Sequence, residues 1–320
     1  MMQNNPPMIE VNSLRIDYDN VTAVDHLSLS IPKGQIFGLV GPNGAGKTST
    51  IKALAGIIEP TSGNVKIAGY DLESQREKAL MGLCYMPDFP PVYENLRVWE
   101  YLDIFAAAYK IPFKDRIFKV RLWLDKVQLT DKFDSLIKEL SRGMRQRLVL
   151  AKTLLPDPKV LLLDEPASGL DPLARSQMRG LLLEATEEER TILISSHILT
   201  ELRDFCNAIG VLEKGRLVVS GTLAEIREKL QMKKKIHVIT AESFHQFKFG
   251  IREYVQGNPH LHNMDEINSN KFILTFSGND KDASAILNSL VEQGLNISNF
   301  HVKEDDIEDI FFQIGAKKVS

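Results

Sequence analysis

A glycine-rich loop between a strand and a helix limits the possible folds of this chain more than any other feature. Residues 41–48, Gly-Pro-Asn-Gly-Ala-Gly-Lys-Thr, match the phosphate-binding pattern G-x-x-x-x-G-K-[ST]. The apolar run 36–40 precedes the loop, and the helix-like residues 48–56 follow it. Because the loop needs both neighbours in this order, the motif predicts an α/β fold in which a buried parallel strand leads into the loop.

The residue types in this loop predict a nucleoside triphosphate and Mg²⁺ as ligands. Backbone N–H groups that turn inward, together with the positive end of the following helix, suit phosphate oxygens. The Lys47 ammonium is expected at the β- and γ-phosphates, and the Thr48 hydroxyl on Mg²⁺. The predicted nucleotide contacts are Gly41, Asn43, Gly44, Ala45, Gly46, Lys47, Thr48 and Ser49. GTPases, kinases, helicases and transporters share this motif, so the loop alone does not select among them.

A second apolar run, residues 160–163, ends in two carboxylates, Asp164 and Glu165. Beside the phosphate loop, Asp164 is expected to hold Mg²⁺, and Glu165 to act as general base toward the attacking water. Alternatively, the two residues are ordinary solvent-exposed acids at a strand end. The apolar strand before them and the phosphate loop upstream make this interpretation less favourable.

The rest of the chain indicates two domains, which suits its 320 residues. Residues 8–230 alternate strand-like and helix-like segments, with a helical insert at about 96–140. Residues 231–235, Gln-Met-Lys-Lys-Lys, are interpreted as a solvated linker rather than a contact with lipid or nucleic acid. Residues 236–316 suggest the order β-α-β-β-α-β, with a final helix at 307–314, which is typical of a small α+β, ferredoxin-like accessory domain.

Net charge, apolar content and cysteine content indicate the cellular compartment of the chain. The formal net charge of −3 gives no broad electrostatic footprint for nucleic acid. No stretch is long and apolar enough to span a membrane, and the first residues do not have the pattern of a signal peptide. Cys84 and Cys206 form neither a metal pattern nor a disulfide framework. The sequence therefore predicts a cytoplasmic protein, and any membrane span would belong to another chain.

Further motifs follow in an order that resembles the ATP-binding-cassette (ABC) family of ATPases. Residues 140–147, Leu-Ser-Arg-Gly-Met-Arg-Gln-Arg, resemble the family's signature motif, 94 residues after Lys47 at Ser141. Residues 168–171, Ser-Gly-Leu-Asp, resemble its D-loop, and residues 195–197, Ser-Ser-His, its switch histidine. The resemblance implies that Ser141, Gly143 and Asp171 contact nucleotide, that His197 approaches the γ-phosphate, and that Tyr18 stacks on adenine. Asp171 as a helix N-cap and Tyr18 as an ordinary strand-edge residue are the alternatives.

Two positions depart from the family pattern. Arg142 replaces the first glycine of the signature, a variant that resembles the cassettes of type-two exporters. Asp88, after Tyr85-Met86-Pro87, stands where the family usually has the glutamine of the Q-loop. A carboxylate there is shorter and charged, so Asp88 either binds Mg²⁺ directly or leaves the contact to water.

The resemblance also implies partners. The signature of one cassette closes over ATP held by another, so a second nucleotide-binding subunit, identical or paralogous, is expected. A membrane permease on a separate chain is expected to insert a short helix near residues 87–96, where Phe89, Val92 and Tyr93 either line its groove or pack the insert onto the sheet. Residues 306–314 resemble the "LEDIF" tail of exporter-type cassettes, with regulation, dimer contacts or simple stabilisation as open roles.

Three functions are compatible with a phosphate loop of this kind. The favoured one is the ATP-hydrolysing subunit of an ABC transporter, more in keeping with export, located on the cytoplasmic face of the membrane. A soluble mechanical ATPase that acts on ribosomes or DNA usually has a coiled-coil insertion, zinc cysteines or tandem cassettes, which this sequence lacks. A regulator that binds ATP without turnover is disfavoured because Glu165 and His197 are both present.

Overall fold

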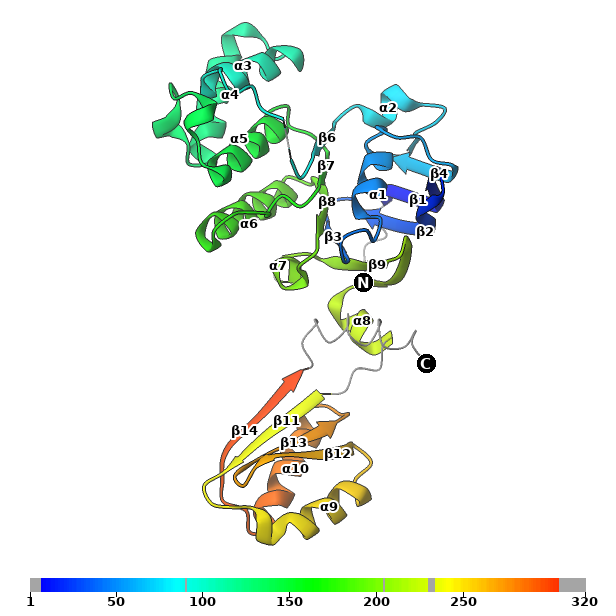
Figure 1. The fold of residues 1–320 in the computed structure, drawn as a ribbon, viewed down its shortest axis with the longest axis vertical. Helices are drawn as coiled ribbons and strands as arrows, with labels where there is room; N and C mark the ends of the chain where they lie inside the picture. Colours follow the sequence, from blue (N-terminus) through cyan, green and yellow to red (C-terminus); the bar gives the residue numbers. More distant parts are fainter. Residues whose placement is uncertain (1–6, 90, 204, 230–233, 305–320) are drawn as a thin grey trace. The chain divides into compact units, whose positions relative to one another are not determined.

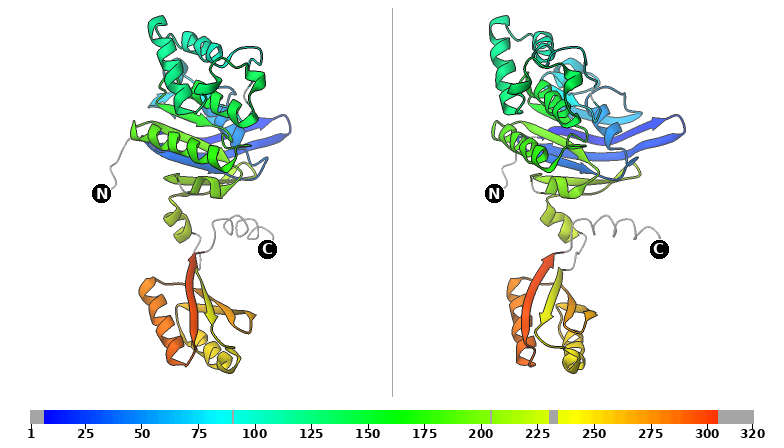
Figure 2. Two further views of the ribbon diagram at one scale, coloured as in Figure 1. Left: turned by 90° about the vertical axis from the view of Figure 1, so that its left-hand side faces the viewer. Right: turned by 60° about the vertical axis from the view of Figure 1, so that its left-hand side comes forward.

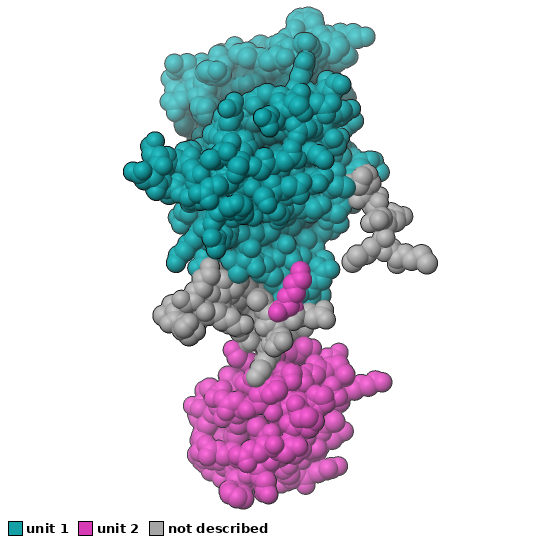
Figure 3. Space-filling model, turned by 90° about the vertical axis from the view of Figure 1, so that its right-hand side faces the viewer, with its two compact units in different colours: residues 1–226 teal, residues 227–320 magenta. Residues whose placement is uncertain are grey.

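The computed structural model describes residues 7–89, 91–203, 205–229 and 234–304. The chain divides into two compact units, residues 1–226 and 227–320 (Figures 1–3). Each unit has its own sheet and its own apolar core. Together they have the mixed α/β class predicted from the sequence, with a parallel sheet in the first unit and a small α+β second unit.

A six-stranded sheet with the order β10-β9-β3-β8-β7-β6 forms the centre of the first unit. Neighbouring strands from β9 to β6 run parallel, and β10 pairs antiparallel with β9 at one edge. All residues of β3, β7 and β8 are buried, as their apolar runs predict. The strands are β3 (Ile36–Val40), β6 (Leu83–Met86), β7 (Val160–Leu163), β8 (Thr191–Ser196), β9 (Ala208–Glu213) and β10 (Arg216–Gly221).

An antiparallel sheet with the order β2-β1-β4-β5 belongs to the same unit. Its strands are β1 (Pro7–Tyr18), β2 (Val21–Pro32), β4 (Ser62–Ile67) and β5 (Tyr70–Asp71). Two helices follow the phosphate loop and β5, namely α1 (Lys47–Leu54) and α2 (Arg76–Leu80). Ile9 of β1, Leu39 of β3 and Ile51 of α1 belong to one buried apolar cluster, so the two sheets share a core.

The helical insert contains α3 (Val98–Ala108), α4 (Phe113–Lys126) and two 3₁₀ turns, Thr130–Lys132 and Ile137–Glu139. It is followed by α5 (Arg142–Leu154), against which α3 and α4 pack. Val98, Leu102, Phe105 and Tyr109 recur at the spacing of three to four residues that is typical of one helix face. Only the first two are buried, because the core of the insert takes Tyr101 instead and leaves Tyr109 45% exposed. The remaining helices of this unit are α6 (Pro172–Glu187), α7 (Leu199–Arg203) and α8 (Leu223–Lys229), which extends past the unit boundary.

The second unit has the element order predicted for it. Its elements are β11 (Lys234–Thr240), the 3₁₀ turn His245–Phe247, α9 (Lys248–Gly257), β12 (Leu261–Asn268), β13 (Lys271–Phe276), α10 (Asp280–Glu292) and β14 (Ile297–Glu304). The antiparallel sheet order β12-β13-β11-β14 is that of a ferredoxin-like sandwich. The strand β11 begins within the predicted linker, and the predicted helix 307–314 lies outside the described residues.

Apolar residues from both helices and three strands form the core of this unit. Alternate residues of β11 and β13 are buried, among them Ile236, Val238, Phe272 and Leu274. No helix among the described residues has the length and apolar character needed to cross a membrane.

Candidate functional site

Four loops meet at one edge of the parallel sheet. The carboxyl ends of neighbouring parallel strands lie at the same edge, and the residues that follow β3, β6, β7 and β8 are the phosphate loop, Asp88, Asp164-Glu165 and His197. Crossover connections through helices bring these segments together although they are far apart in the sequence (Figure 1).

Glycine is required at both ends of the phosphate loop. A Cβ on Gly41 would lie 2.3 Å from the carbonyl oxygen of Leu212, and one on Gly46 would lie 2.4 Å from that of Ala23. Gly46 also has φ +103°, a left-handed conformation that side chains rarely adopt, at the start of α1. The backbone of the loop therefore packs directly against neighbouring backbone, which leaves its other side for an anion at the N-terminus of α1.

The loop lysine is buried and held by oxygen atoms. Lys47 is 6% exposed, and its Nζ donates to the carbonyl oxygens of Gly41 at 2.7 Å and Pro42 at 3.3 Å. The same atom lies 3.4 Å from Oε1 of Glu165, whose side chain is 12% exposed. The structure thus brings together the lysine after β3 and the acid after β7.

Glu165 stands between this lysine and the histidine after β8. Its Oε2 lies 2.8 Å from Nδ1 of His197, whose side chain is 46% exposed. Glu165 has φ +47°, which is uncommon for a residue with a side chain. Its backbone N–H donates to Ser195 Oγ at 3.0 Å, and this bond helps to hold that conformation. Strain of this kind is frequent at functional sites, where the surrounding structure maintains it.

Asp164 is almost completely buried, and Ser195 orients it. The Ser195 hydroxyl donates to Asp164 Oδ1 at 2.6 Å, so one serine bonds to both neighbouring acidic residues. The motifs in the sequence give Ser195 no role of its own. The signal that could have revealed it is a pair of polar residues, Ser195 and Ser196, at the end of an otherwise apolar strand next to β7.

Asp88 lies close enough to the two acids for their charges to affect it. Partial burial raises the pKa of its carboxyl group, and the charges of Glu165 and Asp164 raise it further, while Arg142 and His197 act in the opposite direction. Within the part of the chain that the structure describes, Asp88 Oδ1 is buried without a hydrogen-bond partner. Among the described residues, no group of three or more His, Cys, Asp or Glu side chains is arranged to hold a metal ion by itself, so these three acids do not form a ready-made metal site. The nearby Tyr85 has its pKa raised to about 12, chiefly by burial.

The signature residues are connected to the segment after Glu165 rather than to the phosphate loop. Ser141 is the N-cap of α5, and its Oγ accepts from the Met144 N–H at 3.3 Å. Arg142 donates to Ser168 Oγ at 3.2 Å, and its guanidinium lies 5.5 Å from the centre of the Phe89 ring. Within the described part of the chain, no hydrogen bond or ion pair joins Ser141 or Gly143 to residues 41–48.

Tyr18 and Asp171 also lie outside this cluster of bonds. Tyr18 ends β1, opposite Val21 of β2, and its ring is 44% exposed. Asp171 is the N-cap of α6, where its carboxylate accepts from the Ala174 N–H at 2.8 Å. The N-cap interpretation of Asp171 therefore holds in this structure, and it leaves the other carboxylate oxygen for a further contact.

Comparison with protein families matches residues 24–168 to a family described as "ABC transporter". Among curated relatives, the bacitracin transport ATP-binding protein BcrA of Bacillus licheniformis is 31% identical over 315 residues, 96% of this chain and 97% of that protein. The Nod factor export ATP-binding protein I of Ralstonia nicotianae is 36% identical over 220 residues, 69% of this chain and 68% of that protein.

Solved structures give the same result for the fold. An ATP-binding subunit of an ABC transporter is 31% identical with a TM-score of 0.65, covering 70% of this chain and 93% of its own. The cbiO1 subunit of Clostridium perfringens is 26% identical with a TM-score of 0.62, covering 71% and 93%. These similarities confirm the predicted phosphate-loop cassette fold.

Proposed function

Since the chain belongs to the family of ABC transporter ATP-binding proteins, we propose that it powers export through a membrane permease carried on a separate chain. As a member of this family it binds and hydrolyses ATP to drive transport. Export is favoured because relatives are named for bacitracin transport and Nod factor export, and because the signature carries Arg142. In this proposal residues 8–230 form the cassette, 231–235 the linker and 236–316 the accessory domain.

The observation that carries the chemistry is the position of Glu165 between Lys47 and His197, at 3.4 and 2.8 Å. When ATP binds, its γ-phosphate competes with Glu165 for the Lys47 ammonium. The released carboxylate keeps His197 as a partner and accepts a proton from the attacking water. His197 then places its other ring nitrogen toward the γ-phosphate, so the two side chains position water and phosphate together.

The residues around Asp164 fit Mg²⁺, which would supply positive charge to the phosphate oxygens during hydrolysis. The Thr48 side chain is exposed at the start of α1, and Asp164 has one oxygen fixed by Ser195. The unpartnered Oδ1 of Asp88 offers a third oxygen. A hydroxyl and one or two carboxylates, completed by substrate phosphate, are the set that Mg²⁺ usually takes in nucleotide sites.

A second cassette completes the proposed site. Ser141 is exposed, and among the described residues neither it nor Gly143 bonds to the chain's own phosphate loop. We place both residues, with Asp171, at the γ-phosphate of ATP held by the partner cassette, and Tyr18 on the adenine of its own ATP. ATP then stabilises the closed pair and hydrolysis favours its opening, because the two states differ in affinity for ATP and ADP.

The permease is proposed to dock beside the segment after β6. Phe89 and Tyr93 have 74% and 60% of their surfaces exposed, which supports a docking role over packing of the insert onto the sheet. Val92 is only partly exposed. Docking there would hold the chain at the cytoplasmic face of the membrane.

Replacement of the proposed base tests the hydrolysis mechanism. We expect Glu165→Gln to bind ATP, to lose about 10²–10⁴ in turnover, and to accumulate as an ATP-bound dimer on size-exclusion chromatography. Glu187→Gln, at the exposed end of α6, makes the same charge change away from the site and should behave as wild type. Normal turnover in Glu165→Gln would refute the assignment of the base.

Capture of partners tests the transport function. Tagged protein is purified from detergent-solubilised membranes of its own cells, and its partners are identified by mass spectrometry. A multi-spanning protein in stoichiometric amount supports the transporter subunit and indicates the substrate class. Recovery only from the soluble fraction with ribosomes or nucleic acid would instead favour a mechanical ATPase.

A further inference from the structure

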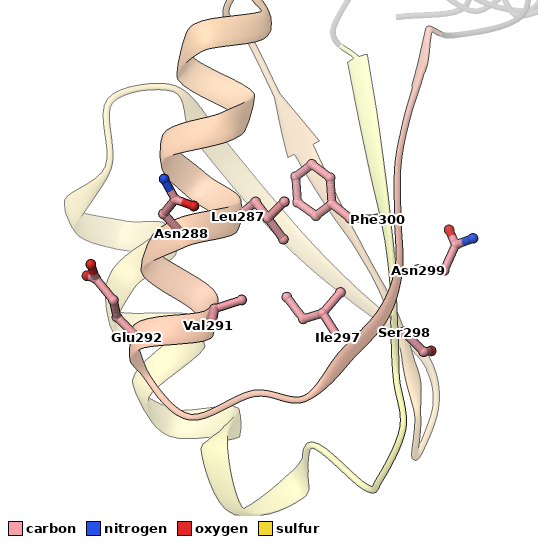
Figure 4. Close-up of a pocket in the computed structure, with 8 residues that line it drawn as sticks. All are labelled: Leu287, Asn288, Val291, Glu292, Ile297, Ser298, Asn299 and Phe300. Carbon is pink, nitrogen blue, oxygen red and sulfur yellow. The ribbon is translucent and has the colours of Figure 1, made fainter.

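The second unit contains an apolar groove that none of its described elements covers. Leu287 and Val291 of α10 face Ile297 and Phe300 of β14 across a hollow of about 480 Å³ (Figure 4). Val291 is 52% exposed, and the other three side chains are only partly buried. Polar residues, Asn288 and Glu292 on the helix and Ser298 and Asn299 on the strand, border the hollow. An apolar centre with a polar border is the character of a docking surface.

The chain itself supplies a segment with the matching pattern. The strand β14 ends at Glu304, and residues 305–320 continue beyond the described part of the chain. Ile307, Ile310, Phe311 and Ile314 follow one another at the spacing that places them on one face of a helix. Charged residues, Asp306, Glu308 and Asp309, alternate with them, so the sequence is amphipathic.

The length of this segment suits the groove. A strand rises about 3.3 Å per residue, so the groove residues on β14 lie about 13–23 Å back from Glu304. Three residues of extended chain from Glu304 to Ile307, followed by a helix from 307 to 314, span about 20 Å. A segment that turned back along β14 would therefore reach the apolar residues of both walls.

The charges at the end of the chain also favour a segment that runs antiparallel to β14. The helix α10 ends at Glu292 and β14 begins at Ile297, so these residues mark one end of the groove. A segment that returned antiparallel to β14 would bring Lys317 and Lys318 toward Glu292, with opposite charge.

We propose that residues 307–314 bind in the groove between α10 and β14 of their own chain as an amphipathic helix. Because residues 307–314 are attached to β14, this contact is intramolecular. A short connection gives the segment an effective concentration at the groove in the millimolar range, which favours it over the same segment of another copy. The bound segment would cover Val291 and Phe300 and add a third helix to the unit. This inference concerns the second unit alone and does not depend on the proposed export function.

Hydrogen exchange on the full-length protein tests the contact. We expect Val291→Asp, which places a charge in the groove, to speed amide exchange of residues 307–314 at least about tenfold relative to wild type. The matched control is Ala285→Asp, the same added charge on an exposed residue of α10 that does not line the groove, and it should exchange as wild type. Continued protection of Ile236 and Val238 shows that the unit remains folded. Equal exchange of 307–314 in all three proteins would overturn the proposal.

Disulfide trapping gives a second measurement that does not depend on a destabilising variant. The pair Val291→Cys with Phe311→Cys should join peptides 282–303 and 304–317 after oxidation and tryptic digestion. The control pair, Asn263→Cys with Phe311→Cys, uses the strand at the opposite edge of the sheet. Oxidation of a mixture of ¹⁵N-labelled and unlabelled protein should give disulfides within one copy only. Cross-links between copies, or no more product than in the control pair, would overturn the proposal.

Discussion

Ser195 offers a direct test of how the site is held together. Its buried hydroxyl donates to Asp164 Oδ1 at 2.6 Å and accepts the Glu165 N–H at 3.0 Å. Ser195→Ala removes both bonds and adds no bulk. The lost bond to a charged acceptor corresponds to about 1.5–3 kcal/mol, and an unsatisfied buried N–H to about 1 kcal/mol or more. We therefore expect the free energy of unfolding to fall by about 3 kcal/mol.

The same change should lower activity, because both acids lose an orienting partner. For a unit of this size, 3 kcal/mol corresponds to a decrease in Tm of about 6–12 °C, measured by calorimetry. We expect kcat for ATP hydrolysis to fall at least about tenfold with a smaller change in KM, since a shift of the acids affects the reacting geometry more than nucleotide binding.

Ser196→Ala is the matched control. Ser196 is also buried, but its Oγ donates to Glu201 Oε2 at 2.9 Å and accepts the Ile198 N–H at 3.0 Å, away from both acids. This variant should also lose stability while it keeps most of its kcat at a temperature where it is folded. The reasoning is refuted if Ser195→Ala loses less than about 0.5 kcal/mol, or if its kcat equals that of Ser196→Ala.

Three further predictions follow from the geometry of the site. Gly46→Ala should abolish ATP binding and destabilise the first unit, because its Cβ would meet the Ala23 carbonyl oxygen at 2.4 Å, and isothermal titration with ATP checks this. Asp88→Asn should raise the Tm of the metal-free protein at about pH 7.5. The pKa of the Asp88 carboxyl group is raised in the folded state, so its ionisation opposes folding as the pH rises. The gain in Tm should therefore disappear toward about pH 3.5, where the carboxyl group is protonated in both states. Ser141→Arg should bind ATP but hydrolyse it slowly, and unchanged hydrolysis would contradict completion of the site by a second cassette.

Much of the first unit could be predicted because its strands are buried on both faces. The apolar runs at 36–40 and 160–163 predict buried parallel strands, and the polar residues directly after them predict the functional edge. The helical insert was predicted less well. Its two helices pack on one another and on α5, so the buried face is chosen by these contacts, and Tyr109 is exposed although its spacing fits the apolar stripe.

The roles of Ser195 and Arg142 could not be read from the sequence. Arg142 was recognised only as a departure from a family pattern, and the structure places it between Ser168 and Phe89, 26 residues later and 53 residues earlier in the chain. Ser195 is 30 residues from Glu165. Contacts between residues so far apart in the sequence depend on which strands are neighbours in the sheet. The order of strands cannot be read from the residues around either position.

Local apolar periodicity and residue type were enough to predict the buried strands, the phosphate loop and a set of candidate side chains, because that information lies within short segments of the sequence. The position of Glu165 between Lys47 and His197, and the serine that bonds to both acids, became visible only in the folded structure. The order of the parallel strands sets these distances, and that order results from burial of the whole sheet against its helices and the antiparallel sheet rather than from any single segment.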